Sequence, residues 1–217
     1  MKKLVIFDLD GTLIDTLKDL AEATNFALEG CGFPKRDLAE YNFLVGRGIT
    51  NLFRGAVPPG KDDPGTIARM RSLFLSYYEN HIHDFSRPYE GIPEVLRALS
   101  DSGVSLAVAS NKYQAGAERL VRHFFGDRFR TILGQRDGLP IKPDPEIVFL
   151  AMQEAGITDK KGVAYVGDSD VDMMTGGNAG VMTVGVTWGF RSREELSAFS
   201  PDAIADTPSS LLSTLLP

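Results

Sequence analysis

The sequence has one cysteine and lacks any long hydrophobic run. Because Cys31 has no second cysteine to pair with, an internal disulfide is excluded and a reducing compartment is favoured. No stretch approaches the roughly 20 consecutive apolar residues that a membrane-spanning helix needs, so we expect no membrane segment. The Met-Lys-Lys start and the short apolar run behind it are too short for a secretory signal. We therefore expect a cytoplasmic protein.

Positive charge is also scarce. The 23 Lys and Arg residues against 29 Asp and Glu residues give a net charge of −6. This balance disfavours non-specific binding to nucleic acid or to an anionic membrane, and we expect neither as a partner. An anionic small molecule stays possible, because a bound cation can invert the local field. The 217 residues suffice for one large domain, or for a domain with a smaller one. A monomer and a homodimer are equally compatible with the sequence.

An apolar run opens the chain and ends in two acids. Residues 3–7 read Lys-Leu-Val-Ile-Phe, and residues 8–12 read Asp-Leu-Asp-Gly-Thr. A short apolar run that stops at a turn is typical of a buried strand in a parallel sheet. Asp8 then falls at the carboxyl end of this strand, where open α/β sheets bind ligands. Gly11 allows a turn there and a close approach of backbone N–H groups to a ligand. The alternative is an acid-rich turn without a function.

Helical periodicity dominates the next part of the chain. Apolar residues recur at helical spacing from about residue 15 to residue 85, without a strand pattern. We therefore predict an all-helical cap of residues 15–86, inserted into an α/β core of residues 1–14 and 87–217. The chain would cross between the two parts near Asp15 and near Ser86–Glu90.

Strand-like apolar runs recur in the second half of the chain. They lie at residues 104–110, 131–134, 163–168, 182–186 and 203–205. Helical patterns separate them, and this alternation predicts a doubly wound, Rossmann-like parallel sheet. Ser110-Asn111 and Asp168 end two of the runs, and Lys142 lies in a loop. These residues can meet the acids of the first strand at the carboxyl edge of the sheet.

Four acids would crowd this crevice: Asp8, Asp10, Asp168 and Asp172. At a separation of ~4 Å, each pair of like charges costs about 4 kcal/mol at an effective dielectric constant of 20. Either some of the acids are protonated or a cation joins them. Oxygen ligands of this kind favour Mg²⁺. The alternative, acids that merely stabilise a helix N-terminus, is our interpretation of Asp170.

Together these residues resemble the signatures of the haloacid-dehalogenase-like phosphohydrolase superfamily. That family carries D-x-D-G-T, then a Ser or Thr that ends a strand, a Lys in a loop, and G-D-x-x-x-D. The chain has all four in this order, at Asp8/Asp10, Ser110, Lys142 and Asp168/Asp172.

The resemblance implies a role for each signature residue. Asp8 would be the nucleophile that forms an aspartyl-phosphate, and Asp10 the general acid and then the base. Asp10 also argues against the dehalogenase branch, which would not need this acid. Mg²⁺ would be held by Asp8, the backbone carbonyl of Asp10 and Asp168, with Asp172 in support. The substrate-binding set would comprise Gly11, Thr12, Arg47, Ser110, Asn111 and Lys142.

A cap inserted after the first signature resembles the branch with phosphoglycolate phosphatases, pyrophosphatases and β-phosphoglucomutases. The loop Val45–Gly48 resembles the substrate loop of the phosphoglycolate phosphatases, and Thr187–Leu196 resembles their C-terminal region. The resemblance implies a Mg²⁺-dependent phosphatase for a small phosphorylated metabolite, with 2-phosphoglycolate as the best candidate. Arg47 could pair with a substrate carboxylate or be solvated, and Trp188 could line the cleft or pack in the core.

Other functions remain open at this point. A β-phosphoglucomutase-like phosphomutase or a pyrophosphatase would use the same signatures. A receiver-type signalling domain also places Asp, Ser or Thr, and Lys at strand ends. Asp10, which can activate water, and the inserted cap argue against a receiver domain.

Overall fold

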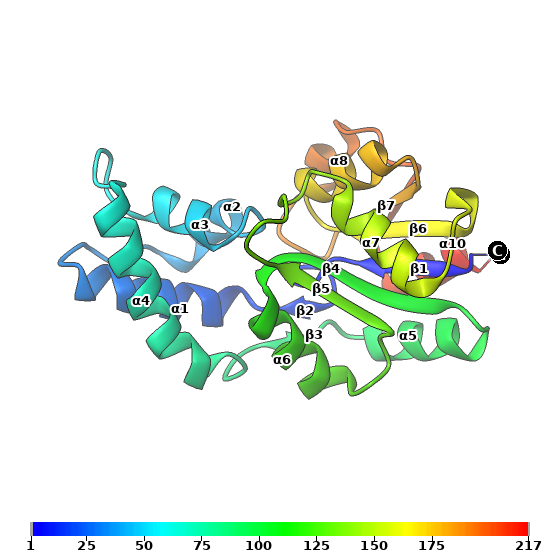
Figure 1. The fold of residues 1–217 in the computed structure, drawn as a ribbon, viewed down its shortest axis with the longest axis horizontal. Helices are drawn as coiled ribbons and strands as arrows, with labels where there is room; N and C mark the ends of the chain where they lie inside the picture. The colour runs from blue at the N-terminus through cyan, green and yellow to red at the C-terminus, as the bar shows by residue number, and fades with distance from the viewer. Residues whose placement is uncertain (1, 217) are drawn as a thin grey trace.

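A parallel sheet and a group of helices occupy opposite ends of the molecule (Figure 1). This computed structural model describes residues 2–216, and within them the larger sheet has the strand order β5-β4-β1-β6-β7-β8, with parallel pairing throughout. The strands are β1 (Leu4–Phe7), β4 (Ser105–Tyr113), β5 (Thr131–Gln135), β6 (Val163–Gly167), β7 (Met182–Val186) and β8 (Ala203–Ala205). The predicted fold class, a doubly wound α/β core with an inserted helical cap, is confirmed.

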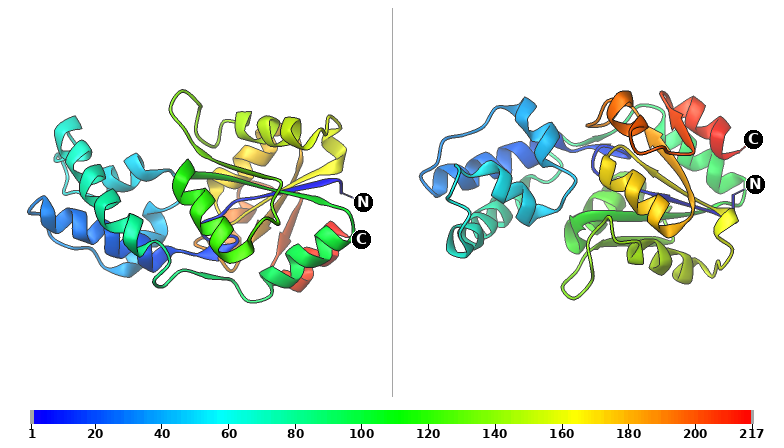
Figure 2. Two further views of the ribbon diagram at one scale, coloured as in Figure 1. Left: turned by 60° about the horizontal axis from the view of Figure 1, so that its bottom comes forward. Right: turned by 90° about the horizontal axis from the view of Figure 1, so that it is seen from above.

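Helices cover both faces of this sheet, as the two views in Figure 2 show. They are α5 (Ile92–Asp101), α6 (Gln114–Phe125), α7 (Glu146–Ala155), α8 (Asp170–Ala179), α9 (Arg193–Ser197) and α10 (Pro208–Leu215). Val5 and Phe7 pack into the apolar cluster that contains α5, α6 and α10. Leu4 and Ile6 pack into a second cluster with α7. Both faces of β1 are therefore buried, which explains why its sequence is apolar without alternation.

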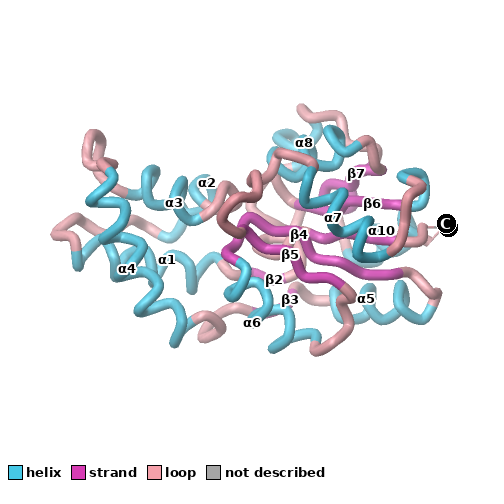
Figure 3. Tube along the Cα trace, in the orientation of Figure 1, coloured by secondary structure: helices cyan, strands magenta, loops and turns pink. Residues whose placement is uncertain are grey.

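The cap consists of helices at the end away from the sheet (Figure 3). They are α1 (Leu17–Gly30), α2 (Tyr41–Leu44), α3 (Ile49–Ala56) and α4 (Pro64–His81), with a short 3₁₀ turn η1 (Leu38–Glu40). The long helices α1 and α4 pack against each other, and α4 buries the stripe Met70, Phe74 and Tyr78. None of the helices within residues 2–216 combines the length and the apolar character needed to cross a membrane.

The chain passes between core and cap through two short paired strands. β2 (Ile14–Asp15) and β3 (Arg87–Pro88) pair antiparallel, at the two crossings that we predicted from the sequence. Asp19 at the start of α1 accepts hydrogen bonds from the backbone N–H and the hydroxyl of Ser86, at 2.8 and 2.6 Å. These contacts tie the outgoing and returning chain together. The division at residues 15–86 itself stays a prediction.

The strand that we predicted over residues 104–110 is longer in the structure. We expected it to end at residue 110, but β4 continues to Tyr113, with a register shift against β5 after Ala109. Ser110 and Asn111 therefore lie within the strand, and Lys112 lies with them. The strand continues because β5 still pairs with its end, at Tyr113 and Gln135, and a local sequence pattern does not contain such a pairing.

Candidate active site

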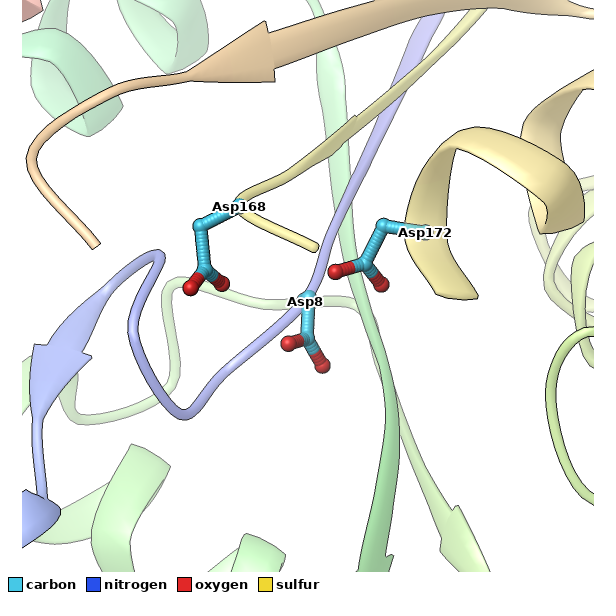
Figure 4. Close-up of side chains that lie close together, drawn as sticks. All are labelled: Asp8, Asp168 and Asp172. Carbon is cyan, nitrogen blue, oxygen red and sulfur yellow. The ribbon is translucent and has the colours of Figure 1, made fainter. Parts of the chain in front are cut away.

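Three carboxylates converge where β1 and β6 end (Figure 4). Asp8 follows β1, Asp168 follows β6, and Asp172 lies in the first turn of α8. One oxygen atom from each lies within 4.8 Å of the others, and all three side chains are buried. The structure thus brings together three of the acids whose crowding we expected from the sequence.

Lys142 supplies a positive charge to this cluster. Its Nζ atom lies 2.8 Å from Oδ1 of Asp8 and 2.7 Å from Oδ1 of Asp172. It also donates to the hydroxyl of Tyr165 at 2.9 Å and to the carbonyl oxygen of Ala109 at 3.1 Å. The side chain of Lys142 is only 2% exposed, so solvent screens these contacts little.

Asp172 is held on both of its carboxylate oxygens. Oδ1 accepts from Lys142 and, at 3.2 Å, from the Tyr165 hydroxyl. Oδ2 accepts from the hydroxyl of Ser169 at 2.5 Å and from its backbone N–H at 3.1 Å. The Ser169 hydroxyl also accepts from the Asp172 N–H, which completes a capping box at the start of α8. Asp172 is therefore better placed to orient the cluster than to bind a ligand.

Asp168 is held by two donors as well. The hydroxyl of Thr12 donates to Oδ1 at 2.8 Å, and the backbone N–H of Phe190 donates to Oδ2 at 2.8 Å. The sequence left open whether Trp188 lines the cleft or packs in the core. In the structure its indole N–H donates to the carbonyl oxygen of Thr12 at 3.1 Å. In this structure Thr12 and Trp188 thus fix the turn around Asp168.

Two glycines let the backbone approach Asp168 closely. Gly11 has a φ of +92°, and a Cβ atom there would lie 2.4 Å from Oδ2 of Asp168. A Cβ atom on Gly189 would lie 2.3 Å from the carbonyl oxygen of Gly11. Any side chain at either position would displace Asp168 or the turn. The predicted contact of Gly11 with a ligand stays a prediction.

Burial, and then the negative charges within the acid cluster, shift the pKa values of its members. Burial, together with the Asp172 carboxylate, raises the pKa of Asp8 to about 7, although Lys142 opposes the shift. Burial and the carboxylates of Asp172 and Asp8 hold the pKa of Asp168 well above its ordinary value. Burial lowers the pKa of Lys142, but Asp172 and Asp8 outweigh it and leave this pKa raised. The cluster would therefore accept a second cation.

Asp10 lies apart from the three acids and has its own partners. The hydroxyl of Thr16 donates to its Oδ1 at 2.7 Å. Nζ of Lys112 lies 3.1 Å from Oδ1 and 3.3 Å from Oδ2, and also donates to the Tyr78 hydroxyl at 2.8 Å. Sequence reasoning missed Lys112. The available signal was a lysine that directly follows the Ser-Asn pair. A lysine that is buried at such a place needs an ionic partner.

Asn111 joins three segments of the site. Its Nδ2 donates to the carbonyl oxygen of Gly46 in the cap at 3.0 Å, and its Oδ1 accepts from the backbone N–H of Lys142 at 2.9 Å. The hydroxyl of Ser110 accepts from the backbone N–H of Lys112 at 3.2 Å. Ser110 and Asn111 are both buried. The structure places them beside Asp8 and Asp10, with which they line a common pocket.

This pocket lies between core and cap. Its core wall carries the polar groups, and its cap wall is mostly apolar. The cap wall consists of Leu20, Val45, Gly46, Gly48, Ile49, Leu52, Phe74 and Tyr78. Small-molecule sites are commonly apolar clefts with a few convergent polar groups, and this pocket has that composition.

Arg47 points away from this pocket. Its Nη2 atom lies 2.6 Å from Oδ2 of Asp170 at the start of α8, and its side chain is about half exposed. Arg191 lies on the other side of Asp170, 3.9 Å from Oδ1, and donates to the carbonyl oxygen of Asn42 in the cap. These contacts hold the cap loop against the core. The predicted contact of Arg47 with a substrate carboxylate stays a prediction.

The donor set suits a small divalent cation. The ligand atoms are carboxylate oxygens, which hard cations such as Mg²⁺ prefer. Within residues 2–216, the hydrogen-bond donors to Asp168 are neutral groups. Lys142 donates to one of the two carboxylate oxygens of Asp8. Burial first, and then the neighbouring carboxylates, raise the pKa values of both acids, and a bound cation would oppose both effects. The residues therefore fit Mg²⁺.

Comparison with known proteins shows which sequences and folds the chain resembles. Residues 5–186 match the sequence model of a family described as haloacid dehalogenase-like hydrolase. The chain is 36% identical to a phosphoglycolate phosphatase of Pseudomonas putida, over 98% of this chain and 79% of that one. It is 33% identical to an N-acetylmuramic acid 6-phosphate phosphatase of Pseudomonas aeruginosa, over 98% and 94%. A solved structure of a predicted phosphoglycolate phosphatase from Haemophilus somnus superposes with a TM-score of 0.91 at 30% identity, over 98% of this chain and 97% of that one.

Proposed function

Since the chain belongs to the haloacid dehalogenase-like hydrolase family and is a phosphatase, we propose that it is Mg²⁺-dependent and hydrolyses a small organic phosphomonoester through an aspartyl-phosphate intermediate. The observation that carries this proposal is the buried trio Asp8, Asp168 and Asp172, compensated by a single ammonium group from Lys142. Such a site lacks positive charge until a cation enters.

Asp8 and Asp168 would hold Mg²⁺, together with the backbone carbonyl of Asp10. When bound, the ion neutralises negative charge on the carboxylates and on the phosphate oxygens of the substrate. Thr12 and the backbone of Phe190 keep the Asp168 carboxylate in one orientation, since each donates to one of its oxygens. Asp172 supports the site by holding Lys142.

Asp8 is the proposed nucleophile. Lys142 donates to its Oδ1, and one carboxylate oxygen of Asp8 would attack phosphorus while the other faces the ion. The P–O bond to the leaving alcohol breaks as the bond to Asp8 forms, and Asp10 gives its proton to the departing oxygen. Asp10, now ionised, then takes a proton from the water that attacks the aspartyl-phosphate. Inorganic phosphate leaves, and Asp8 is regenerated.

Ser110, Asn111 and Lys142 are the proposed ligands of the phosphate oxygens. Ser110 and Asn111 line the pocket beside Asp8. Lys142 would reduce the repulsion between the Asp8 carboxylate and the phosphate, because it already contacts Asp8 at 2.8 Å. Phosphoryl transfer requires mainly this kind of positioning and charge stabilisation. Residues 15–86, the proposed cap, would enclose the leaving group.

We propose 2-phosphoglycolate as the first substrate to test, because several relatives carry the name phosphoglycolate phosphatase. N-acetylmuramic acid 6-phosphate is a second candidate, because another relative is named for that substrate at 33% identity. Both combine a phosphate with a carboxylate. Arg47 would need to leave Asp170 to bind that carboxylate.

One panel of assays tests the proposal. Phosphate release would be measured for both candidates and for p-nitrophenyl phosphate, with Mg²⁺ and with EDTA, in wild type and in Asp8→Asn. We expect release only with Mg²⁺ and with Asp8 intact. Activity in EDTA would remove the metal from the proposal, and wild-type rates in Asp8→Asn would remove the nucleophile.

The same panel separates hydrolysis from phosphomutase activity. A mutase would return the phosphoryl group to a sugar phosphate and would depend on a sugar bisphosphate. We expect stoichiometric release of inorganic phosphate without such a primer. Dependence on a sugar bisphosphate would favour the mutase instead.

A further inference from the structure

Lys112 is a buried cation that the proposed reaction leaves unused. It lies in β4, two residues after Ser110, and its side chain is 3% exposed. Its Nζ atom contacts oxygen atoms of Asp10 and Tyr78, which come from the first signature and from the cap helix α4. A fully enclosed lysine is costly unless such partners compensate it. This position therefore calls for an explanation.

We propose that Lys112 is a positioning residue that holds the carboxylate of Asp10 for proton transfer. This role rests on the proposed function, in which Asp10 exchanges a proton with the leaving alcohol and with water. Among the described residues, Lys112 forms its ion pair with Asp10, whereas Lys142 pairs with Asp8 and Asp172. The two lysines thus serve different carboxylates.

The contacts determine how Asp10 is oriented. Thr16 and Lys112 both donate to Oδ1, at 2.7 and 3.1 Å. Oδ2 has the longer contact with Lys112, at 3.3 Å. Lys112 therefore reaches both oxygens while Thr16 holds Oδ1, and these contacts together fix the rotation of the carboxylate. Oδ2, which has the weaker contact, is the oxygen that we assign to proton transfer. Without Lys112, Thr16 alone would hold Asp10, and the carboxylate could turn about that single bond.

Tyr78 fixes the ammonium end of Lys112 in turn. Its side chain is fully buried, and its hydroxyl lies 2.8 Å from Nζ of Lys112. Nζ also lies 4.9 Å from the centre of the Tyr78 ring. Tyr78 belongs to the cap, so the orientation of Asp10 depends on a residue from the inserted helices.

The test compares leaving groups. p-Nitrophenolate departs without a proton, whereas the alcohol of n-propyl phosphate needs one. The step in which the leaving group departs, which kcat/KM reports, therefore depends strongly on Asp10 for the second substrate alone, although Asp10 serves both substrates in the later attack of water. We expect Lys112→Met to lose at least about 10-fold more in kcat/KM for n-propyl phosphate than for p-nitrophenyl phosphate. Equal losses on both substrates would mean a merely structural role and would overturn the proposal. Lys35→Met, which removes an exposed ion pair with Glu29, is the control and should leave both rates unchanged.

A double-mutant cycle asks whether Lys112 acts through Asp10. If it does, Lys112→Met should cost almost nothing further for n-propyl phosphate in an Asp10→Asn background. Independent, multiplying losses would overturn the proposal. If Lys112→Met does not fold, Tyr78→Phe replaces it and should show the same dependence on the leaving group, and equal losses would again refute it. A wild type that hydrolyses neither ester would refute the proposed function, whereas an active wild type with equal losses refutes only the role of Lys112.

Discussion

Replacing Lys142 by methionine tests the electrostatic design of the site directly. Methionine keeps most of the side-chain volume but removes the charge, so Asp8 and Asp172 would be left buried without their cation. Both carboxylates are at most 7% exposed, and Lys142 also donates to Tyr165 and to the Ala109 carbonyl. Breaking one partner out of a buried ion pair costs about 3–5 kcal/mol. We expect Lys142→Met to lower the free energy of unfolding by about 4 kcal/mol at pH 8 without Mg²⁺.

The pH dependence of this loss has a definite sign. The pKa of Asp8 in the folded protein is already raised from 3.8 to about 7, and Lys142 opposes that shift. Without Lys142 this pKa rises further. A group with a raised folded-state pKa stabilises the protein at low pH, and that contribution is lost as pH rises through the folded-state value. The deficit of the variant should therefore be larger at pH 8 than at pH 6.

Urea denaturation in EDTA at these two pH values measures the effect. Trp188 contacts the turn beside Asp168 through Thr12, so its fluorescence reports on this region. Arg122→Met is the control, because the pair of Arg122 with Asp127 is exposed, and its loss should be about 0.5 kcal/mol or less. A loss below about 1 kcal/mol in Lys142→Met, or a deficit that grows toward acid pH, would refute this reasoning.

Two adjacent glycines of α8 should respond in opposite ways. A Cβ atom on Gly176 would lie 2.3 Å from Oγ1 of Thr183, whereas a Cβ atom on Gly177 meets open space. Gly176→Ala should destabilise the folded protein by about 1–3 kcal/mol through overpacking. Gly177→Ala should stabilise it by up to about 1 kcal/mol. Urea denaturation measures both variants, and the opposite ranking would contradict this packing. Thr12→Val removes the hydroxyl that holds Asp168 and should weaken Mg²⁺ binding about 10-fold. Calorimetric titration measures this affinity, and an unchanged affinity would show that the Thr12 hydroxyl does not support the metal site. Arg47→Ala should raise KM for 2-phosphoglycolate more than for p-nitrophenyl phosphate if Arg47 binds the carboxylate, and equal changes would limit Arg47 to its contact with Asp170.

Local signals in the sequence were sufficient to predict the fold class of the core and the edge of the sheet at which Asp8 lies. The apolar run of β1 and the acids behind it predicted a buried strand with Asp8 at its carboxyl end, and the structure agrees. Parallel strands align their carboxyl ends at one edge of a sheet. Residues as distant in sequence as Asp8 and Asp168 could therefore be placed together without knowledge of any contact.

Contacts between distant segments were not predictable in the same way. Lys112 was missed because its partners, Asp10 and Tyr78, lie 102 and 34 residues away, and one of them belongs to the cap. The close packing that requires Gly176 depends on Thr183 in the neighbouring strand. The position of Arg47 against Asp170 depends on how the cap meets the core.

The amino-acid sequence by itself determined which elements form and where the reactive side chains fall along them. Hydrophobic periodicity, turn residues and the order of four signatures are properties of short segments, and burial of the apolar faces enforces them. Only the tertiary structure decided which cation faces which carboxylate. That choice depends on distances of about 3 Å between side chains from separate segments, and these distances are fixed by how those segments pack together in the folded core.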